Sequence, residues 1–270
     1  MRALYVFLAR TNMSQDAHQI YRELVRLAQT DANVLGFVLG GSRGKGFAAE
    51  HSDYDCVMIV ADKARAVYAV KMRELPSLFD VGVYTLQEFA ERAAWGGELA
   101  WDRYNWAHLR AQVDKTGGKI QALIDEKGKV PADEVRKFVQ GELDHYINQV
   151  YRSIKCCRDG NTIGYRFEAA DSVKPLLDVL FAVHDRRLRP YYKYLQWELT
   201  RFPLHKFSWT ADQLLELLQT ILADGSYRAQ QHIFREVESV LRAEGYGEVF
   251  DSWGEELWIR DYPEKVSGRS

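Results

Sequence analysis

Two short apolar segments that flank a glycine-rich turn and a pair of aspartates constrain the fold of this chain most. The turn is Gly40-Gly41-Ser42, and the aspartates, Asp53 and Asp55, follow after a spacer of ten residues. Apolar runs of this length, bounded by glycine and polar residues, are typical of buried β-strands. Because side chains alternate across a strand, the two aspartates are expected to point to one face, about 7 Å apart.

This arrangement suits a particular chemistry. Glycine lets backbone N–H groups approach a phosphate closely, and the hydroxyl of Ser42 adds a donor. Paired carboxylates supply the oxygen ligands that Mg²⁺ prefers, and they repel each other unless a cation lies between them. The pattern therefore favours a site for Mg²⁺ and a polyphosphate. The alternative is a hairpin loop that carries two solvated aspartates.

The pattern resembles the signature of the nucleotidyltransferase superfamily that includes DNA polymerase beta and the antibiotic adenylyltransferases. In that signature a hydrophobic residue, Gly and Gly or Ser are followed, after a spacer of roughly ten residues, by alternating acidic and hydrophobic positions. Gly41-Ser42 and Asp53-Tyr54-Asp55-Cys56 fill these positions. The resemblance implies transfer of a nucleoside monophosphate from ATP or another NTP, with two Mg²⁺ ions as cofactors.

Members of this superfamily usually hold their metals with three carboxylates, and Asp80 is the expected third. It interrupts the apolar run LFDVGV, which predicts a third strand over residues 78–85. Gly82 would share its face and leave space for substrate. The alternative is that Asp80 is solvated at a strand start. Glu50 and Asp62 are weaker candidates, because both lie outside the apolar runs.

Basic residues beside the turn extend the predicted phosphate site. The resemblance implies that Gly40, Gly41 and Ser42 hold the phosphates. Arg43 and Lys45 follow at once and are positioned to pair with the γ-phosphate. The alternative is that both are solvated loop charges. The turn is not a P-loop, because the spacing of its glycines and the expected Gly-Lys-Ser/Thr are absent.

Helices are predicted in both halves of the chain, and the second half has no convincing strand pattern. Apolar stripes at helical spacing predict helices over residues 14–29, 63–75, 132–158, 166–185, 191–199 and 226–244, and a capping box at Thr210 and Gln213 predicts one more. Apart from the first two, all of these follow a linker near residues 125–133. The fold class is therefore α+β: a mixed αβ nucleotidyltransferase domain with a short central sheet, residues 1–127, and an all-α helical bundle, residues 128–270.

This layout resembles the kanamycin- and lincosamide-type adenylyltransferases, which implies two further sets of residues. The segment HDRRLRPYYKYL, residues 184–195, is similar to one in which a Lys after a Pro reaches the triphosphate, so Arg189 and Lys193 are expected to bind the nucleotide. Glu168 and Asp171 are candidates for the general base toward the acceptor hydroxyl, if partial burial near other carboxylates raises the pKa. The alternative for both sets is a solvated charged face.

Composition limits the classes of function. The chain has 270 residues and a net charge of −2, from 36 basic and 38 acidic residues. That balance weighs against a polymerase that reads an extended nucleic acid template. No apolar run approaches 18 residues, so no membrane span is expected. Three cysteines without a CxxC spacing indicate reduced thiols and a cytoplasmic protein. The apolar stretch within residues 1–10 is too short for a secretory signal.

The sequence thus predicts a cytoplasmic, Mg²⁺-dependent nucleotidyltransferase. The favoured reaction is transfer of AMP from ATP to a hydroxyl of a small molecule, such as an antibiotic-like metabolite. One alternative is an adenylyltransferase that modifies a protein partner, as in toxin–antitoxin pairs. Another is a catalytically silent member that only binds a nucleotide.

Overall fold

The chain divides into two compact units, residues 1–129 and 130–270. The computed structural model describes residues 13–263, so the segment considered above as a possible secretory signal lies outside the described residues. The boundary between the units lies after residue 129, two residues beyond the expected boundary after residue 127. The first unit is a mixed αβ domain with a four-stranded sheet, and the second is helical, so the predicted fold class is confirmed.

The sheet of the first unit has the strand order β3-β2-β1-β4. Its strands are β1 (Val34–Leu39), β2 (Tyr54–Val60), β3 (Phe79–Tyr84) and β4 (Ala111–Asp114). β1 runs antiparallel to both β2 and β4, whereas β2 runs parallel to β3. The two strands predicted to carry carboxylates are therefore neighbours that run in the same direction.

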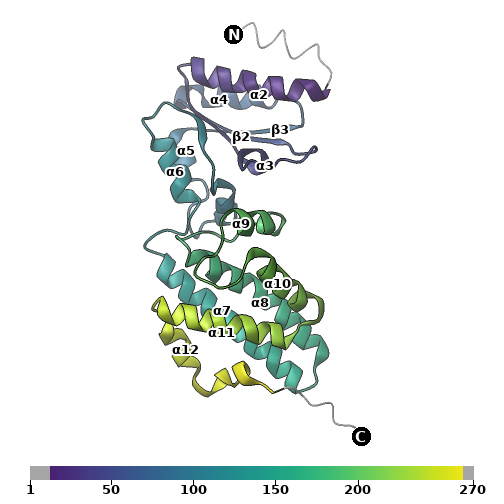
Figure 1. Cartoon of the computed structure of the whole chain (residues 1–270). Coiled ribbons are helices and arrows are strands. Elements are labelled where there is room, and N and C mark those ends of the chain that lie inside the picture. The colour runs from purple at the N-terminus through teal and green to yellow at the C-terminus, as the bar shows by residue number, and fades with distance from the viewer. Residues whose placement is uncertain (1–12, 264–270) are drawn as a thin grey trace. The chain divides into compact units, whose positions relative to one another are not determined.

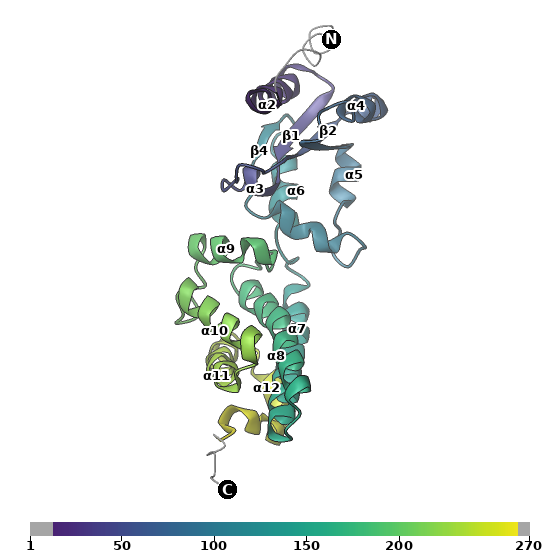
Figure 2. The same ribbon diagram turned by 90° about the vertical axis from the view of Figure 1, so that its right-hand side faces the viewer.

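Helices cover both faces of this sheet (Figures 1 and 2). Helices α2 (Met13–Thr30) and α4 (Arg65–Met72) lie on one face, and α5 (Leu86–Glu91) and α6 (Lys119–Lys127) lie on the other. Residues of β2 alternate between two apolar cores. Met58 packs on the side of α2 and α4, and Ile59 packs on the side of α5 and α6. Burial on both faces explains why this strand reads as a continuous apolar run.

Four elements of the first unit did not emerge from the sequence, namely β4, α5, α6 and a 3-10 helix over Ala100–Trp106. β4 has four residues, of which only Val113 is buried, so its alternation is too short to detect. α5 starts at a capping box in which Thr85 and Glu88 satisfy each other's backbone N–H groups. α6 has only a weak apolar stripe. The short helix α3 (Gly41–Gly44) occupies the glycine turn.

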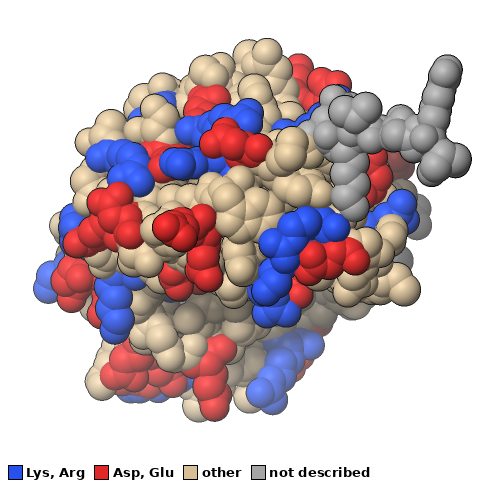
Figure 3. Space-filling model, turned by 90° about the horizontal axis from the view of Figure 1, so that it is seen from below, with Lys and Arg blue, Asp and Glu red and all other residues tan. Residues whose placement is uncertain are grey.

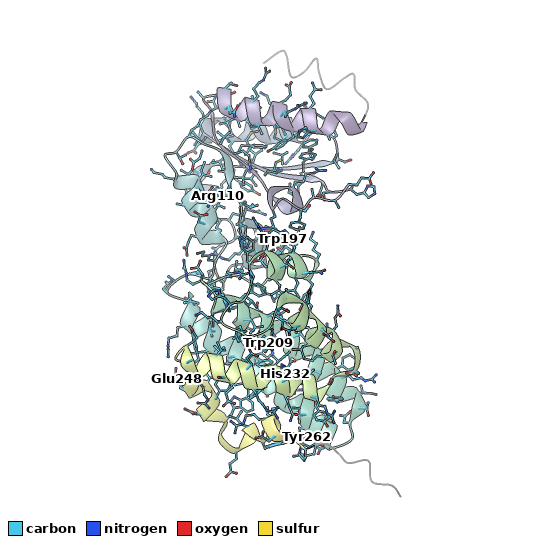
Figure 4. All side chains as sticks on the ribbon, in the orientation of Figure 1. Arg110, Trp197, Trp209, His232, Glu248 and Tyr262 are labelled. Atoms are coloured by element: carbon cyan, nitrogen blue, oxygen red, sulfur yellow. The ribbon has the colours of Figure 1, made fainter. Side chains whose placement is uncertain are left out.

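The second unit is built on a long helical pair. Its helices are α7 (Val135–Arg158), α8 (Thr162–Ala182), α9 (Leu195–Arg201), α10 (Ala211–Asp224), α11 (Tyr227–Ala243) and α12 (Gly247–Trp253), with 3-10 turns over 192–194 and 254–261. The capping box predicted at Thr210 and Gln213 is formed, and α10 ends at Gly225 in the left-handed region. Near the end of the described chain, Tyr262, labelled in Figure 4, packs against Trp258 and Tyr227.

Several boundaries in the second unit differ from the prediction. Helix α8 begins at Thr162 rather than at 166, because the side chain of Asn161 accepts a hydrogen bond from the N–H of Gly164 and caps it. Pro175 lies inside the same helix, buried among apolar neighbours. Within residues 13–263, no helix is both long and apolar enough to cross a membrane.

Candidate functional site

Asp55 and Asp80 lie side by side in the sheet. In the parallel register of β2 and β3, Asp55 is paired with Asp80, and the residues before them, Tyr54 and Phe79, are paired as well. Neighbouring strands are about 4.8 Å apart, so paired side chains on one face are in direct reach of each other. The two carboxylates therefore share one face of the sheet.

The opposite face of these positions is aromatic. The rings of Tyr54 and Phe79 stack with centroids 4.7 Å apart, and Tyr21 packs on Tyr54 at 5.5 Å. Tyr54 is buried, whereas Asp55 is half-buried. The predicted alternation across the second strand is confirmed for this pair. Asp53 lies one residue before β2 and is exposed, because the strand begins at Tyr54 and not, as predicted, at residue 53.

The glycine turn packs directly against Asp55. The N–H of Gly40 donates to the carbonyl oxygen of Asp55 at 2.6 Å. A Cβ added at Gly41 would lie 2.0 Å from Oδ2 of Asp55, and Gly41 has φ +55. A side chain at this position would displace the carboxylate, so glycine is needed for both space and backbone conformation. This contact places the turn beside the carboxylate pair.

Ser42 and Arg43 fasten the loop that leads into β2. The hydroxyl oxygens of Ser42 and Ser52 are 2.9 Å apart. The guanidinium of Arg43 donates to the carbonyl oxygens of Ser52 and Asp53 and lies 4.1 Å from the centroid of the Tyr54 ring. These contacts fix the backbone from which Asp53 projects. They give Arg43 a structural role, which corrects the alternative of a solvated loop charge, and its predicted contact with a phosphate stays a prediction.

Lys45 does not occupy the place predicted for it. Its side chain is 8% exposed, and Nζ donates to the carbonyl oxygens of Tyr104, Asn105 and Ala107. An ammonium group has three hydrogens, and three carbonyls accept them here. Lys45 thus ties the loop after β1 to the turn before β4. We correct the expectation of a solvated or phosphate-binding Lys45 accordingly.

The space predicted above Gly82 is filled. A Cβ added at Gly82 would lie 2.7 Å from Cε2 of Tyr84 and 3.0 Å from its hydroxyl oxygen. Gly82 therefore makes room for the phenol ring of Tyr84 and not for a substrate atom directly over the strand. Tyr84 was not singled out from the sequence, since a tyrosine at a strand end ordinarily reads as packing.

The field of the two aspartates reaches the core of β2. Burial, and to a smaller extent the charges of Asp55 and Asp80, raise the pKa of the Cys56 thiol to about 12. The thiol therefore stays protonated at neutral pH and is a packing residue rather than a nucleophile. Cys56, Cys156 and Cys157 are all free thiols, as the sequence indicated.

The three-carboxylate set predicted for Mg²⁺ is only partly assembled. Among residues 13–263, no group of three or more His, Cys, Asp or Glu side chains is arranged to hold a metal ion. Asp55 and Asp80 are paired in register, while Asp53 stands outside the strand. The donor set still fits the ion in kind, because Mg²⁺ binds one or two carboxylates and completes its shell with water and phosphate oxygens.

The basic segment of the second unit is largely neutralised within that unit. Arg187 donates to Oε1 of Glu198 at 2.9 Å, and Nε of Arg189 donates to Oδ1 of Asp178 at 3.0 Å. Asp178 is 8% exposed and also accepts from Lys174. Arg189 is therefore engaged as the partner of a buried carboxylate, which argues against the predicted nucleotide contact.

Lys193 differs from these arginines. It is exposed, its Nζ lies 4.7 Å from the centroid of the Tyr194 ring, and within the described residues it has no carboxylate partner. Its predicted contact with a phosphate stays a prediction.

The two candidates for the general base have different surroundings. Glu168 accepts a hydrogen bond from Arg152, and the side chains of the two residues are 17% and 55% exposed. Asp171 is exposed on the same helix. The prediction required partial burial near other carboxylates, whereas Glu168 has an arginine partner and Asp171 is exposed. Their role as a base stays a prediction that nothing in the geometry strengthens.

Surface charge agrees with the composition. On the face shown in Figure 3, basic and acidic side chains are interleaved rather than gathered into a patch of one sign. Such a face offers no continuous track for a nucleic acid backbone.

Comparisons with known proteins identify no family. No protein-family model matches the chain, and no curated protein matches its sequence. Among solved structures, the chain is similar to a nucleotidyltransferase-like protein from Exiguobacterium sibiricum, with 13% identity and a TM-score of 0.35 over 90% of this chain and 91% of the other. Similarity at this level does not bear on activity, so the functional argument depends on the site itself.

Proposed function

We propose that this chain is a Mg²⁺-dependent nucleotidyltransferase that transfers AMP from ATP to a hydroxyl group of a small molecule. The observation that carries the proposal is the pairing of Asp55 with Asp80 across two parallel strands, next to the glycine turn that packs on Asp55. Like charges at adjacent positions are unfavourable on their own. Their cost is offset where a cation and a polyphosphate bind.

Each part of the site has a distinct task in this reaction. Gly41 and Ser42 open the helix α3, whose first N–H groups have no acceptor within the helix and would donate to the phosphates of ATP. Asp55 and Asp80 would hold the metal, and Asp53, one residue before β2, is the candidate for a third carboxylate. Mg²⁺, when bound there, neutralises charge that builds up on the phosphate oxygens.

The chemical step is an in-line displacement. The acceptor oxygen forms a bond to the α-phosphorus, and the bond from that phosphorus to the α–β bridging oxygen breaks. Pyrophosphate leaves with the electron pair, and the proton of the hydroxyl passes to a carboxylate base or to water. The protein contributes chiefly by positioning the two reactants and by electrostatic stabilisation.

The test is direct. The purified chain is incubated with Mg²⁺, ATP labelled at the α-phosphate and a panel of hydroxylated small molecules, and both pyrophosphate and labelled products are measured. We expect label in a product and an equal amount of pyrophosphate, both abolished by Asp55→Asn. Absence of Mg²⁺-dependent ATP binding in the wild-type chain would end the proposal.

A second candidate is an adenylyltransferase whose acceptor is a protein. It is favoured by two large apolar side chains one turn apart on α8, Ile163 and Phe167, which are 73% and 70% exposed. An exposed apolar pair of this kind is suited to a protein partner. Label from ATP on a protein band, lost in Phe167→Ser and retained in Val70→Ser on α4, would favour this candidate over a small-molecule acceptor.

A further inference from the structure

Ser52 lies where the loop after the glycine turn leads into β2, and the reaction described above gives it no task. It is half-buried and directly precedes Asp53. Its Oγ lies 2.9 Å from Oγ of Ser42 and accepts a hydrogen bond from the N–H of Ala49, also at 2.9 Å. One side chain therefore joins the turn to the segment that carries the carboxylates.

The main chain of Ser52 is held at both of its polar atoms. The N–H donates to the carbonyl oxygen of Ala49 at 3.1 Å. The carbonyl oxygen accepts from Nε and Nη2 of Arg43 at 3.0 and 2.6 Å, and this guanidinium lies 4.1 Å from the centroid of the Tyr54 ring. These contacts fix the Ser52 hydroxyl relative to the turn before any ligand binds, which lowers the entropy cost of binding.

The two hydroxyls carry one hydrogen each, and the use of these hydrogens decides what Ser42 can offer a ligand. A hydroxyl donates one hydrogen bond and has two lone pairs that accept. While Ser42 donates to Ser52, it has no hydrogen left for a phosphate. Oγ of Ser52 then accepts from Ser42 and from Ala49, and within residues 13–263 its own hydrogen has no further acceptor. That hydrogen can form the reverse bond, from Ser52 to Ser42.

A phosphate at the turn favours the reverse bond. Ser42 is the second residue of α3, and its neighbour Gly41 packs on Asp55. Phosphate oxygens are strong acceptors, so they attract the hydrogen of Ser42. When both hydroxyls rotate, donors run in one direction from the N–H of Ala49 through Ser52 and Ser42 to the phosphate. Hydrogen bonds in such a chain polarise and strengthen one another.

We propose that Ser52 is a positioning residue for the phosphate site, and that it turns the hydroxyl of Ser42 toward a phosphate by donating its own hydrogen to Ser42. This inference rests on the proposed function. It adds the residue that makes Ser42 a donor. The step changes no covalent bond, and it only reverses the direction of one hydrogen bond between the two serines.

Titration calorimetry with MgATP and with Mg²⁺ tripolyphosphate tests the proposal. We expect Ser52→Ala to raise both Kd values by the same factor, about threefold to tenfold, which is the contribution of one hydrogen bond. The factors should agree because Ser42 meets only phosphate oxygens. Ser52→Thr keeps a hydroxyl and should restore the wild-type Kd. Ser77→Ala, at an exposed position of the same unit, is the matched control and should not change it.

A double-mutant cycle with Ser42 separates positioning from a general loosening of the loop. If Ser52 acts through Ser42, Ser52→Ala should have no further effect on the Kd in the Ser42→Ala background. Single-turnover kinetics provide a second readout. The rate at which bound ATP reacts should change by less than about twofold in Ser52→Ala, because Asp55 and Asp80 are unaltered. Thermal unfolding verifies that each variant is folded.

Three results would overturn the proposal. They are a Kd in Ser52→Ala equal to or below that of the wild type, additive effects of the changes at Ser42 and Ser52, and a large loss of the single-turnover rate at an unchanged Kd. Each of them leaves the proposed function intact, provided that the wild-type chain binds MgATP. Wild-type chain that binds neither MgATP nor Mg²⁺ tripolyphosphate would instead refute the proposed function.

Discussion

Asp55 and Asp80 occupy paired positions in the parallel strands β2 and β3, so that two carboxylates separated by 24 residues in sequence meet on one face of the sheet. The paired residues on the other face, Tyr54 and Phe79, are stacked aromatic rings. The same register therefore builds a charged face and a packed face. The charged face is the centre of the proposed site, and the packed face keeps it in place.

The first prediction concerns this pair. Asp55→Asn should abolish ATP turnover while thermal unfolding stays close to that of the wild type, because only a charge is removed from a half-buried position. Mg²⁺-dependent ATP binding, measured by titration calorimetry, should weaken as well. Asp62→Asn is a matched control, since Asp62 is an exposed aspartate of the same unit just beyond β2. Turnover at the wild-type level in Asp55→Asn would exclude the proposed chemistry.

Asp80 is expected to act mainly in the transition state. Asp80→Ala should lower turnover by several orders of magnitude and raise the apparent ATP constant only modestly, because the interaction strengthens as the acceptor oxygen attacks. Single-turnover kinetics with saturating ATP measure the two effects separately. If ATP binding were lost while bound ATP still reacted, another carboxylate would have this role.

Lys45 should be important for stability. Lys45→Met leaves the carbonyls of Tyr104, Asn105 and Ala107 without their donor, so we expect the free energy of unfolding to fall by about 2–4 kcal/mol. Lys63→Met, at an exposed position of the same unit, should change it by less than about 0.5 kcal/mol. Denaturant unfolding provides both values. Equal effects of the two changes would contradict the structural role of Lys45.

His184 should make stability depend on pH. Its Nδ1 lies 2.7 Å from the carbonyl oxygen of Leu180, and Nε2 accepts from the N–H of Lys206, which fits a neutral ring. Burial, and to a smaller extent nearby positive charges, lower the pKa of His184 from 6.5 to about 4. A lowered pKa means that the unfolded chain binds the proton first, so this stabilisation is complete above pH 6.5 and is lost as the pH falls toward 4.

Between pH 6.5 and 4 the contribution of His184 to the free energy of unfolding should fall by about 3 kcal/mol, which corresponds to the lowering of its pKa. It can be measured as the difference between wild type and His184→Gln in urea unfolding at a series of pH values. His232→Gln, which changes an exposed histidine of the same unit, should leave the pH dependence as in the wild type. A pH dependence that is identical in all three proteins would refute the assignment.

Lys193 tests the contribution of the second unit. Lys193→Ala should raise the apparent ATP constant about tenfold to a hundredfold, the value of one charge-assisted phosphate contact, with little loss of stability at this exposed position. Lys155→Ala, on the helix α7 of the same unit, is the control for a general change of charge. Equal ATP constants in Lys193→Ala and the wild type would remove Lys193 from the site.

The sequence was most informative where chemistry and strand periodicity coincide. Gly41, Asp55 and Asp80 were identified because a glycine turn and acidic residues interrupt apolar runs, and the structure places these three residues together. The long helices of the second unit were predictable from their apolar stripes and from the capping box at Thr210. These signals are local in sequence, so tertiary packing does not alter them.

The remaining features depend on contacts between distant segments. In the sequence, Lys45 lies in a polar loop and is typical of a solvated charge. It is buried and donates hydrogen bonds because residues 104–107 pack against it in the fold. Arg189 reads as part of a basic turn until Asp178, one helix earlier, becomes its partner. The position of Tyr84 over Gly82 follows from a side-chain rotamer, which strand periodicity does not specify.

The most direct test of the central claim is to locate the metal. Crystals grown with Mn²⁺ and a non-hydrolysable ATP analogue would give an anomalous signal at each bound ion. We predict a peak within about 2.0–2.3 Å of carboxylate oxygens of both Asp55 and Asp80, with the triphosphate against Gly41 and Ser42. A bound nucleotide elsewhere on the molecule, with no peak between Asp55 and Asp80, would contradict the account.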